Sequence, residues 1–189
     1  IRITTYGCEQ EVGTPQQGEA VVIRNTQATQ LREAGSPDLP KLTTSVAIGA
    51  TDRMVVRVVS SSFTDYPDMT IAPSKGNLYR NIDPQTVPYT WGAAYQTNRF
   101  FPGELVSLRE PHIIRDLRGQ TVVVYPFQYN PVTKVLRVYN EITVTVEKAD
   151  NNGANTLTAR NPQQTITSEF EQIYKRHFIN YASLSDYTP

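Results

Sequence analysis

The side chains that could support catalysis in this chain are few and lie far apart in the sequence. A cysteine nucleophile needs a base beside it, and the chain offers Cys8 with His112 and His177. No motif joins these residues, and Cys8 belongs to a polar N-terminal segment that contains several glycines. We therefore predict that they form no Cys–His pair and that the chain has no catalytic residue of its own.

Other catalytic and metal-binding motifs are also missing from the sequence. It has no G-x-S-x-G, no H-E-x-x-H and no glycine-rich phosphate loop. A single cysteine excludes an internal disulfide, and there is no Cys/His cluster for a structural zinc ion. Asp65, Asp68 and Asp83 are spaced too loosely for a calcium-binding loop. We expect neither a metal nor a cofactor.

The charge of the chain is balanced. Its Lys and Arg residues number 18 and its Asp and Glu residues also number 18, so the formal net charge is zero. Such a chain lacks the basic footprint that binds nucleic acid or an anionic membrane. It also has no run of 18 apolar residues. We therefore expect neither nucleic-acid binding nor insertion into a membrane.

Residues 64–103 differ from the rest of the chain because prolines and glycines interrupt them repeatedly. Aromatic residues lie between these breaks: Tyr66, Tyr79, Tyr89, Trp91 and Tyr95. Long irregular segments in compact domains are usually functional loops or disordered, and the aromatic residues favour order. We predict that the working surface lies here. One interpretation is a tyrosine-rich platform for sugars, which would make the chain a non-catalytic carbohydrate- or surface-binding module.

The remaining segments must form the scaffold that positions this surface. Alternating β-branched residues predict strands at 19–24, 45–50 and 53–61. The clearest pattern is a strand at 121–125 followed by a turn and a long strand at 135–147, whose apolar and polar residues alternate.

The two ends of the chain have different characters. Residues 1–18 are polar and predict a loosely ordered arm or a weak edge strand. Residues 168–181 predict one amphipathic helix with Ser168 as its N-cap. Many strands with one short C-terminal α-helix indicate a mostly β fold, an antiparallel β-sandwich or jelly-roll-like domain. We expect residues 1–186 to form a single domain.

Five motifs in register resemble a known family. They are residues 71–76 (IAPSKG), 100–104 (FFPGE), 114–120 (IRDLRGQ), 128–134 (QYNPVTK) and, near the end, Ile173-Tyr174 with Phe178 and Asn180-Tyr181. In this order they resemble the N-terminal pro-domain of the arginine-specific gingipains, secreted cysteine endopeptidases of the Bacteroidetes. The similarity extends from about residue 20 to the C-terminus. Because these motifs describe a fold rather than a catalytic centre, they agree with the absence of catalytic residues.

The resemblance implies a role for the chain as a whole. Such a pro-domain precedes its protease in the precursor, assists folding of the protease and keeps it latent during export. The partner would be the cognate catalytic domain in the same precursor, and the location would be the periplasm or the cell surface. Inhibition would come from a substrate-like loop that places a basic side chain in the specificity pocket of the protease. The matching residue here is Arg80, flanked by Leu78, Tyr79 and Asn81, with Arg99 as the substitute candidate.

The resemblance also places a domain boundary near the C-terminus. Tyr187-Thr188-Pro189 is similar to the start of the mature protease, so residues 187–189 would begin the adjoining domain. Members of the family carry Arg immediately before this junction, whereas this chain has Asp186. Either another protease cuts the Asp186–Tyr187 bond, or cleavage occurs elsewhere, or the specificity of the partner differs.

Overall fold

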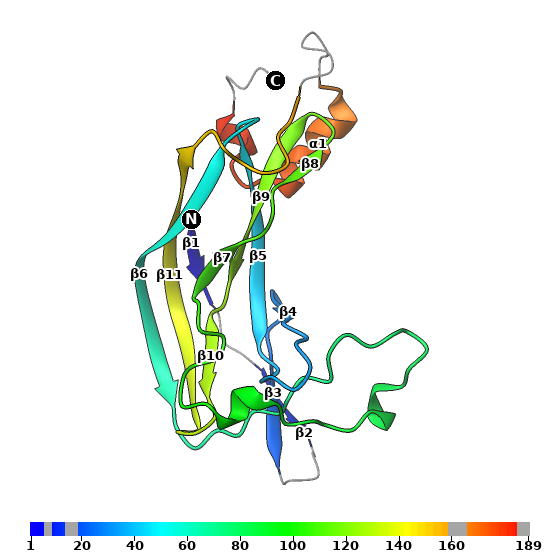
Figure 1. Ribbon diagram of the computed structural model, residues 1–189, viewed down its shortest axis with the longest axis vertical. Helices are drawn as coiled ribbons and strands as arrows, with labels where there is room; N and C mark the ends of the chain where they lie inside the picture. The colour runs from blue at the N-terminus through cyan, green and yellow to red at the C-terminus, as the bar shows by residue number, and fades with distance from the viewer. Residues whose placement is uncertain (6–8, 14–18, 159–165, 185–189) are drawn as a thin grey trace.

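The computed structural model describes residues 1–5, 9–13, 19–158 and 166–184, which form an elongated and mostly β molecule (Figure 1). Its strands are β1 (Arg2–Thr4), β2 (Glu9–Gly13), β3 (Ala20–Arg24), β4 (Thr29–Gln30), β5 (Pro40–Ile48), β6 (Arg53–Tyr66), β7 (Val106–Leu108), β8 (His112–Ile114), β9 (Leu117–Val124), β10 (Phe127–Asn130) and β11 (Val135–Asp150). The helical elements are α1 (Ser168–His177) and the 3-10 turns η1 (Pro84–Thr86), η2 (Ala93–Gln96) and η3 (Tyr181–Ser183).

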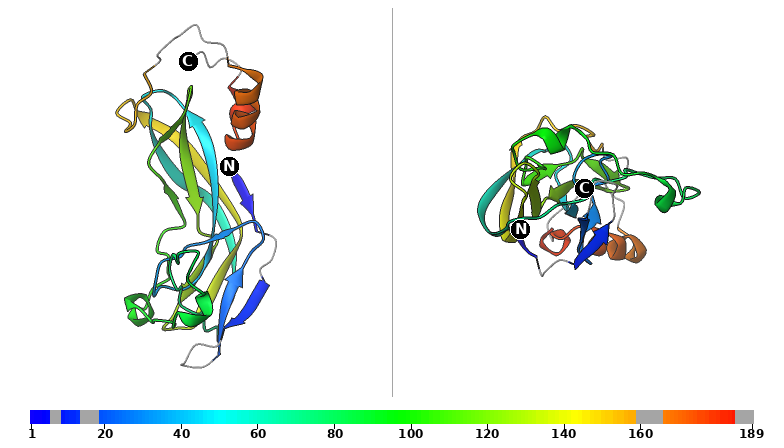
Figure 2. Two further views of the ribbon diagram at one scale, coloured as in Figure 1. Left: turned by 90° about the vertical axis from the view of Figure 1, so that its right-hand side faces the viewer. Right: turned by 90° about the horizontal axis from the view of Figure 1, so that it is seen from below.

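The described strands form three antiparallel sheets. In the four-stranded sheet, β11 pairs with β6 along one edge and with β1 and β10 along the other. In the five-stranded sheet the order is β4-β5-β9-β7, and β8 also pairs with β9. The small third sheet is the β2–β3 hairpin, which lies beside one end of the molecule in Figure 2. The predicted mostly β, antiparallel fold with one C-terminal helix is confirmed.

Two apolar clusters hold these sheets together. Between the two large sheets, Val122 and Val124 of β9 meet Ile142 and Val144 of β11. At the end that carries the β2–β3 hairpin, a second cluster joins segments from every part of the chain: Ile23, Leu39, Ile71, Phe127, Tyr129, Leu136 and Val138. Because Ile71 lies within the irregular segment 64–103, this second cluster anchors that segment to the body.

The strand predictions are correct in position but often too short. The long strand predicted at 135–147 continues to Asp150 as β11, and the strand predicted at 53–61 continues to Tyr66 as β6, its partner along most of its length. The strand predicted at 45–50 is β5, which begins at Pro40. Of the two alternatives for residues 1–18, the described part agrees with edge strands, because β1 pairs with β11 and β2 pairs with β3.

The C-terminal helix is shorter than the predicted 168–181. It ends at His177 because Phe178 adopts an extended backbone and joins Ser45 in a parallel bridge. Its N-cap is Thr167 rather than Ser168. Beyond the helix, the Asn180 side chain accepts from the Ala47 amide at 2.8 Å and donates to the Ala47 carbonyl at 2.9 Å. The Asn180 side chain therefore bonds to the backbone of β5 in the way that a neighbouring strand would.

None of the helices in the described ranges has the length and apolar character needed to span a membrane.

The IRDLRGQ motif has a structural role that its sequence alone does not reveal. Arg118 is completely buried, and its guanidinium donates to the carbonyls of Gly49, Asp52, Ala154 and Asn155 at 2.5–2.9 Å. It therefore joins the β5–β6 turn to the segment that follows β11. Next to it, a side chain on Gly119 would collide with the ring of Phe178. Through Arg118 and Gly119 the motif holds separate parts of the fold together.

The two histidines of the chain meet on the surface where α1 packs against β8. Their Nε2 atoms are 3.0 Å apart and their rings are perpendicular. Burial, reinforced by the charge of His177, lowers the pKa of His112 below its ordinary value of 6.5. The contact needs at least one neutral ring, because two imidazolium ions would both be donors.

This contact predicts a loss of stability in mild acid. A histidine whose pKa is lower in the folded than in the unfolded state stabilises the fold above pH 6.5, and that contribution disappears as the pH falls. The melting temperature should therefore fall between pH 7.5 and 5.5, and less steeply in His112→Gln. Comparing the two proteins by thermal unfolding cancels the contributions of other groups. The same slope of melting temperature against pH in the wild type and in His112→Gln would contradict the prediction.

Candidate functional site

The most distinctive feature of the surface is a loop that projects from one side of the molecule between Gly76 and Gly92 (Figure 1). Both of its ends are fastened to the same short segment of the body. The Ser74 amide donates to the Ser36 carbonyl at 2.8 Å, and the Gly92 amide donates to the Gly35 carbonyl at 2.8 Å. The loop therefore leaves and rejoins the body at nearly one point, which keeps its base fixed.

Two glycines make this close approach of the ends feasible. Gly35 has a φ of 79°, a conformation that favours glycine, and a Cβ on Gly92 would lie 2.8 Å from the Gly35 carbonyl oxygen. A side chain at either position would push the two segments apart. This clamp is not predictable from the sequence, because the two glycines are far apart in the chain and only the fold brings them together.

At the base of the loop, Lys75 connects its two arms. Its ammonium group donates to the Pro84 carbonyl at 2.7 Å and lies 4.2 Å from the centre of the Tyr89 ring. Asp83 accepts a hydrogen bond from the Gln85 amide at 2.9 Å and so begins the 3-10 turn η1. The loop is thus an ordered structure with its own internal bonds, although nearly all of residues 77–86 are exposed.

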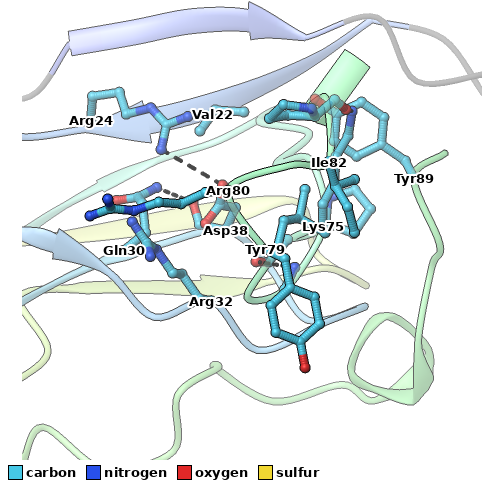
Figure 3. A pocket seen from close by; sticks show the side chains of 15 residues that line it. Val22, Arg24, Gln30, Arg32, Asp38, Lys75, Tyr79, Arg80, Ile82 and Tyr89 are labelled. Carbon is cyan, nitrogen blue, oxygen red and sulfur yellow. Dashed lines mark hydrogen bonds and ion pairs between the residues drawn. The ribbon is translucent and has the colours of Figure 1, made fainter. Parts of the chain in front are cut away.

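Arg80 stands at the tip of the outgoing arm. The Ile82 amide donates to the Tyr79 carbonyl at 3.0 Å, which makes Arg80 and Asn81 the central residues of a tight turn. Tyr79 is 79% exposed and Leu78 is half-buried. Among the described residues, the Arg80 guanidinium has no hydrogen bond and no ion pair. Figure 3 shows its side chain lying back over a cleft, on the side of Gln30 and Asp38.

The substitute candidate, Arg99, has a different position. It follows η2 and directly precedes Phe100, whose ring centre lies 4.3 Å from the Arg137 guanidinium. Arg137 in turn forms a two-pronged ion pair with Asp65 of β6 at 2.8 and 2.9 Å. Arg99 is exposed, but this anchored segment holds it on the body and away from the projecting tip.

The aromatic residues of the irregular segment do not form a common exposed platform. Tyr89 and Trp91 pack against a buried cluster around Ala20, and the Tyr95 hydroxyl donates to the Ile71 carbonyl at 2.8 Å. Burial raises the pKa of Tyr95 far above its ordinary value. Tyr79 and Tyr66 remain exposed, but Tyr79 lies on the projecting loop and Tyr66 at the end of β6. The aromatic residues at the base of the loop therefore serve its packing.

Several residues selected from the sequence lie outside this site. Cys8, Asp186 and Tyr187 fall outside the described residues. In the part of the chain that the structure describes, no group of three or more His, Cys, Asp or Glu side chains could hold a metal ion.

Comparison with known proteins gives a consistent result. The family model Propeptide_C25 matches residues 7–179, so the similarity begins earlier than the sequence motifs indicated. Gingipain R1 of Porphyromonas gingivalis is 48% identical over 179 residues, which cover 95% of this chain and 18% of that protein. Lys-gingipain of the same organism is 29% identical over 154 residues, 77% of this chain and 9% of that protein. The chain therefore spans less than a fifth of the length of either relative.

Two solved structures share the fold. A complex of Porphyromonas gingivalis RgpB pro- and mature domains superposes with a TM-score of 0.88 at 41% identity, covering 96% of this chain and 91% of that chain. A structure concerned with the zymogenic latency of gingipain K superposes with a TM-score of 0.64 at 25% identity, covering 78% of this chain and 86% of that chain. This chain is thus similar over nearly its whole length to a chain of the complex of RgpB pro- and mature domains.

Proposed function

The chain belongs to the Propeptide_C25 family, and from this premise we propose that it keeps a gingipain-like cysteine endopeptidase latent and assists its folding. The inhibitory element would be the projecting loop, with Arg80 in the specificity pocket of the protease and with Leu78, Tyr79 and Asn81 against the adjoining cleft. The observation that carries this proposal is the position of Arg80: it is exposed, it has no partner within the described part of the chain, and it lies in a tight turn of a loop that is clamped and braced.

The chemistry of arginine suits such a plug. Its planar guanidinium can form two charge-assisted hydrogen bonds with a buried carboxylate. Since the Arg80 guanidinium has no partner among the described residues, it can rotate away from the body without breaking an ion pair. A carboxylate at the base of the protease pocket would then become its first charged partner.

The internal contacts of the loop lower the conformational entropy that is lost when it binds. Fixing a flexible loop on binding costs conformational entropy, and a loop that is ordered beforehand avoids much of this cost. In the precursor, covalent linkage to the protease would also raise the effective concentration of the loop to about the millimolar range. Even a modest intrinsic affinity would then keep the active site occupied while the precursor passes through the periplasm to the cell surface.

A titration tests this function. The purified domain should inhibit the separately purified catalytic domain of its precursor in a 1:1 ratio, and by itself it should hydrolyse no peptide substrate. Cys8→Ala should inhibit as well as the wild type. Full protease activity in the presence of excess domain would disprove the proposal.

The internal brace gives a prediction for the loop itself. Lys75→Ala removes both the bond to the Pro84 carbonyl and the contact with the Tyr89 ring, so the loop must be ordered on binding. We expect inhibition to weaken roughly two- to tenfold, the equivalent of about 0.5–1.5 kcal/mol for ordering one segment. Lys75→Arg should restore it because arginine keeps both contacts. An inhibition constant for Lys75→Ala equal to that of the wild type would show that the brace has no role.

Release of the protease would depend on the junction. We propose that the Asp186–Tyr187 bond is the maturation site and that an arginine-specific enzyme does not cut it. N-terminal sequencing of the mature protease decides this. A Tyr187 terminus produced by a purified arginine-specific partner would refute it.

A further inference from the structure

A cleft of about 490 Å³ separates the projecting loop from the body (Figure 3). The strands β3 and β4 and the segment around Asp38 form the body side, and Leu78, Tyr79 and Ile82 form the loop side. A space of this size accommodates several side chains of a binding partner. The latency mechanism proposed above does not use this cleft.

The charges around the cleft are unbalanced, although those of the whole chain are not. Its lining includes four basic side chains, those of Arg24, Arg32, Lys75 and Arg80, and one acidic side chain, that of Asp38. Lys75 is engaged with Pro84 and Tyr89, and Arg80 is assigned to the protease pocket. Arg24 and Arg32 remain as the cations that face the cleft from the body.

The contacts of these two arginines leave room for a further anion. Arg24 lies 3.3 Å from an exposed Glu11 carboxylate and 3.8 Å from Asp38, with 44% of its side chain exposed. Arg32 donates to the neutral amide oxygen of Asn77 at 3.3 Å. Neither guanidinium is saturated by a close, two-pronged ion pair of the kind that Arg137 forms with Asp65.

Asp38 adds a second sign that a partner belongs here. Its side chain is only 14% exposed, and its Oδ1 atom is buried without a hydrogen-bond partner within the described ranges. Burial raises the pKa of this carboxyl, an effect that the charges of Arg24 and Arg32 and a hydrogen bond from the Gln30 side chain partly oppose. Buried carboxylate oxygens are normally paired, because leaving one without a donor costs free energy. Because this oxygen has almost no accessible surface, a donor from a partner seated in the cleft would satisfy it only after the Asp38 side chain turned toward the cleft.

The position of the cleft favours the protease as the partner. If the tip of the loop enters the active-site cleft of the protease, a wall of that cleft would lie next to the space between the loop and the body. We propose that this wall is an acidic segment of the catalytic domain and that Arg24 and Arg32 bind its carboxylates. This inference rests on the proposed function. The cleft behind the loop is then a second docking site that guides the loop into place.

Charge reversal tests the proposal through the kinetics of association. Opposite charges at the edge of an interface mainly accelerate association, and salt weakens that effect. Arg24→Glu/Arg32→Glu should lower the association rate constant with the catalytic domain at least tenfold at 50 mM NaCl, and the deficit should shrink at 500 mM NaCl. The matched control is Arg57→Glu on β6, at the opposite side of the molecule in Figure 1, which should change the rate less than twofold.

The outcomes separate this inference from the proposed function. Because Arg80 is unchanged, the double variant should still inhibit completely at saturation. Arg24→Gln/Arg32→Gln, a milder change, should give an intermediate association rate. Unchanged rates in both double variants would overturn the docking site and leave the latency proposal intact, whereas failure of the wild type to inhibit would refute latency itself. If inorganic phosphate binds the cleft while both double variants associate normally, the cleft is a small-anion site and the inference is wrong.

Discussion

Replacing Arg80 with alanine is expected to weaken inhibition of the catalytic domain by about 2–5 kcal/mol, or roughly 30- to 5,000-fold in the inhibition constant. The reason is that truncation would leave the carboxylate of the protease pocket buried without a partner. The effect should appear mainly in the dissociation rate. Inhibition constants measured with wild type and variant at one salt concentration give the result directly.

Three further variants delimit this prediction. Arg80→Lys keeps the charge but loses the planar fork, so it should fall between wild type and Arg80→Ala. Arg99→Ala should leave inhibition unchanged, because its segment is held on the body by the contact between Phe100 and Arg137. Full inhibition by Arg80→Ala, by Arg99→Ala and by the double variant would eliminate the plug mechanism while leaving the family assignment unaffected.

Replacing Arg118 with methionine is expected to destabilise the fold by about 3–5 kcal/mol. Four backbone carbonyls accept hydrogen bonds from the buried guanidinium, and methionine would fill the space but donate nothing to them. Carbonyls left buried without a donor cost about 1–3 kcal/mol each, and rearrangement or entry of water would recover part of this. The change should appear as a lower midpoint in urea denaturation.

Arg57→Met is the matched control, because Arg57 lies exposed on β6. It should change the free energy of unfolding by less than about 0.5 kcal/mol. A loss of stability in Arg118→Met no greater than that in Arg57→Met would contradict the structural role assigned to the IRDLRGQ motif.

Much of the scaffold was predictable because it follows from local periodicity. β11 alternates apolar and polar residues along most of its length, and the face that packs against β9 carries Ile142 and Val144. The ends of the strands were less predictable. β5 begins five residues before its predicted start, because its pairing with β4 and β9 extends it through a segment whose sequence carries no alternation.

The candidate site, too, was predictable from the sequence only in part. The irregular segment was visible as a run of prolines, glycines and aromatic residues, and the family resemblance selected Arg80 within it. The clamp between Gly35 and Gly92 was not visible, because two distant segments form it. Arg24 and Arg32 are close in the sequence, but only the fold places them in a cleft opposite the projecting loop. The meeting of His112 and His177 was missed for the same reason. Tertiary contacts of this kind leave no periodic signal in a single sequence.

The most direct test of the central claim uses a catalytic domain whose specificity pocket is already filled. A covalent peptidyl inhibitor carrying the side chain that the enzyme prefers would block the pocket and leave the rest of the surface free. Binding of wild type and Arg80→Ala to free and blocked protease can then be compared by calorimetry. If Arg80 is the plug, blocking should raise the dissociation constant of the wild type at least to that of Arg80→Ala on free protease. Equal affinity of the wild type for free and blocked protease would show that Arg80 does not occupy the pocket.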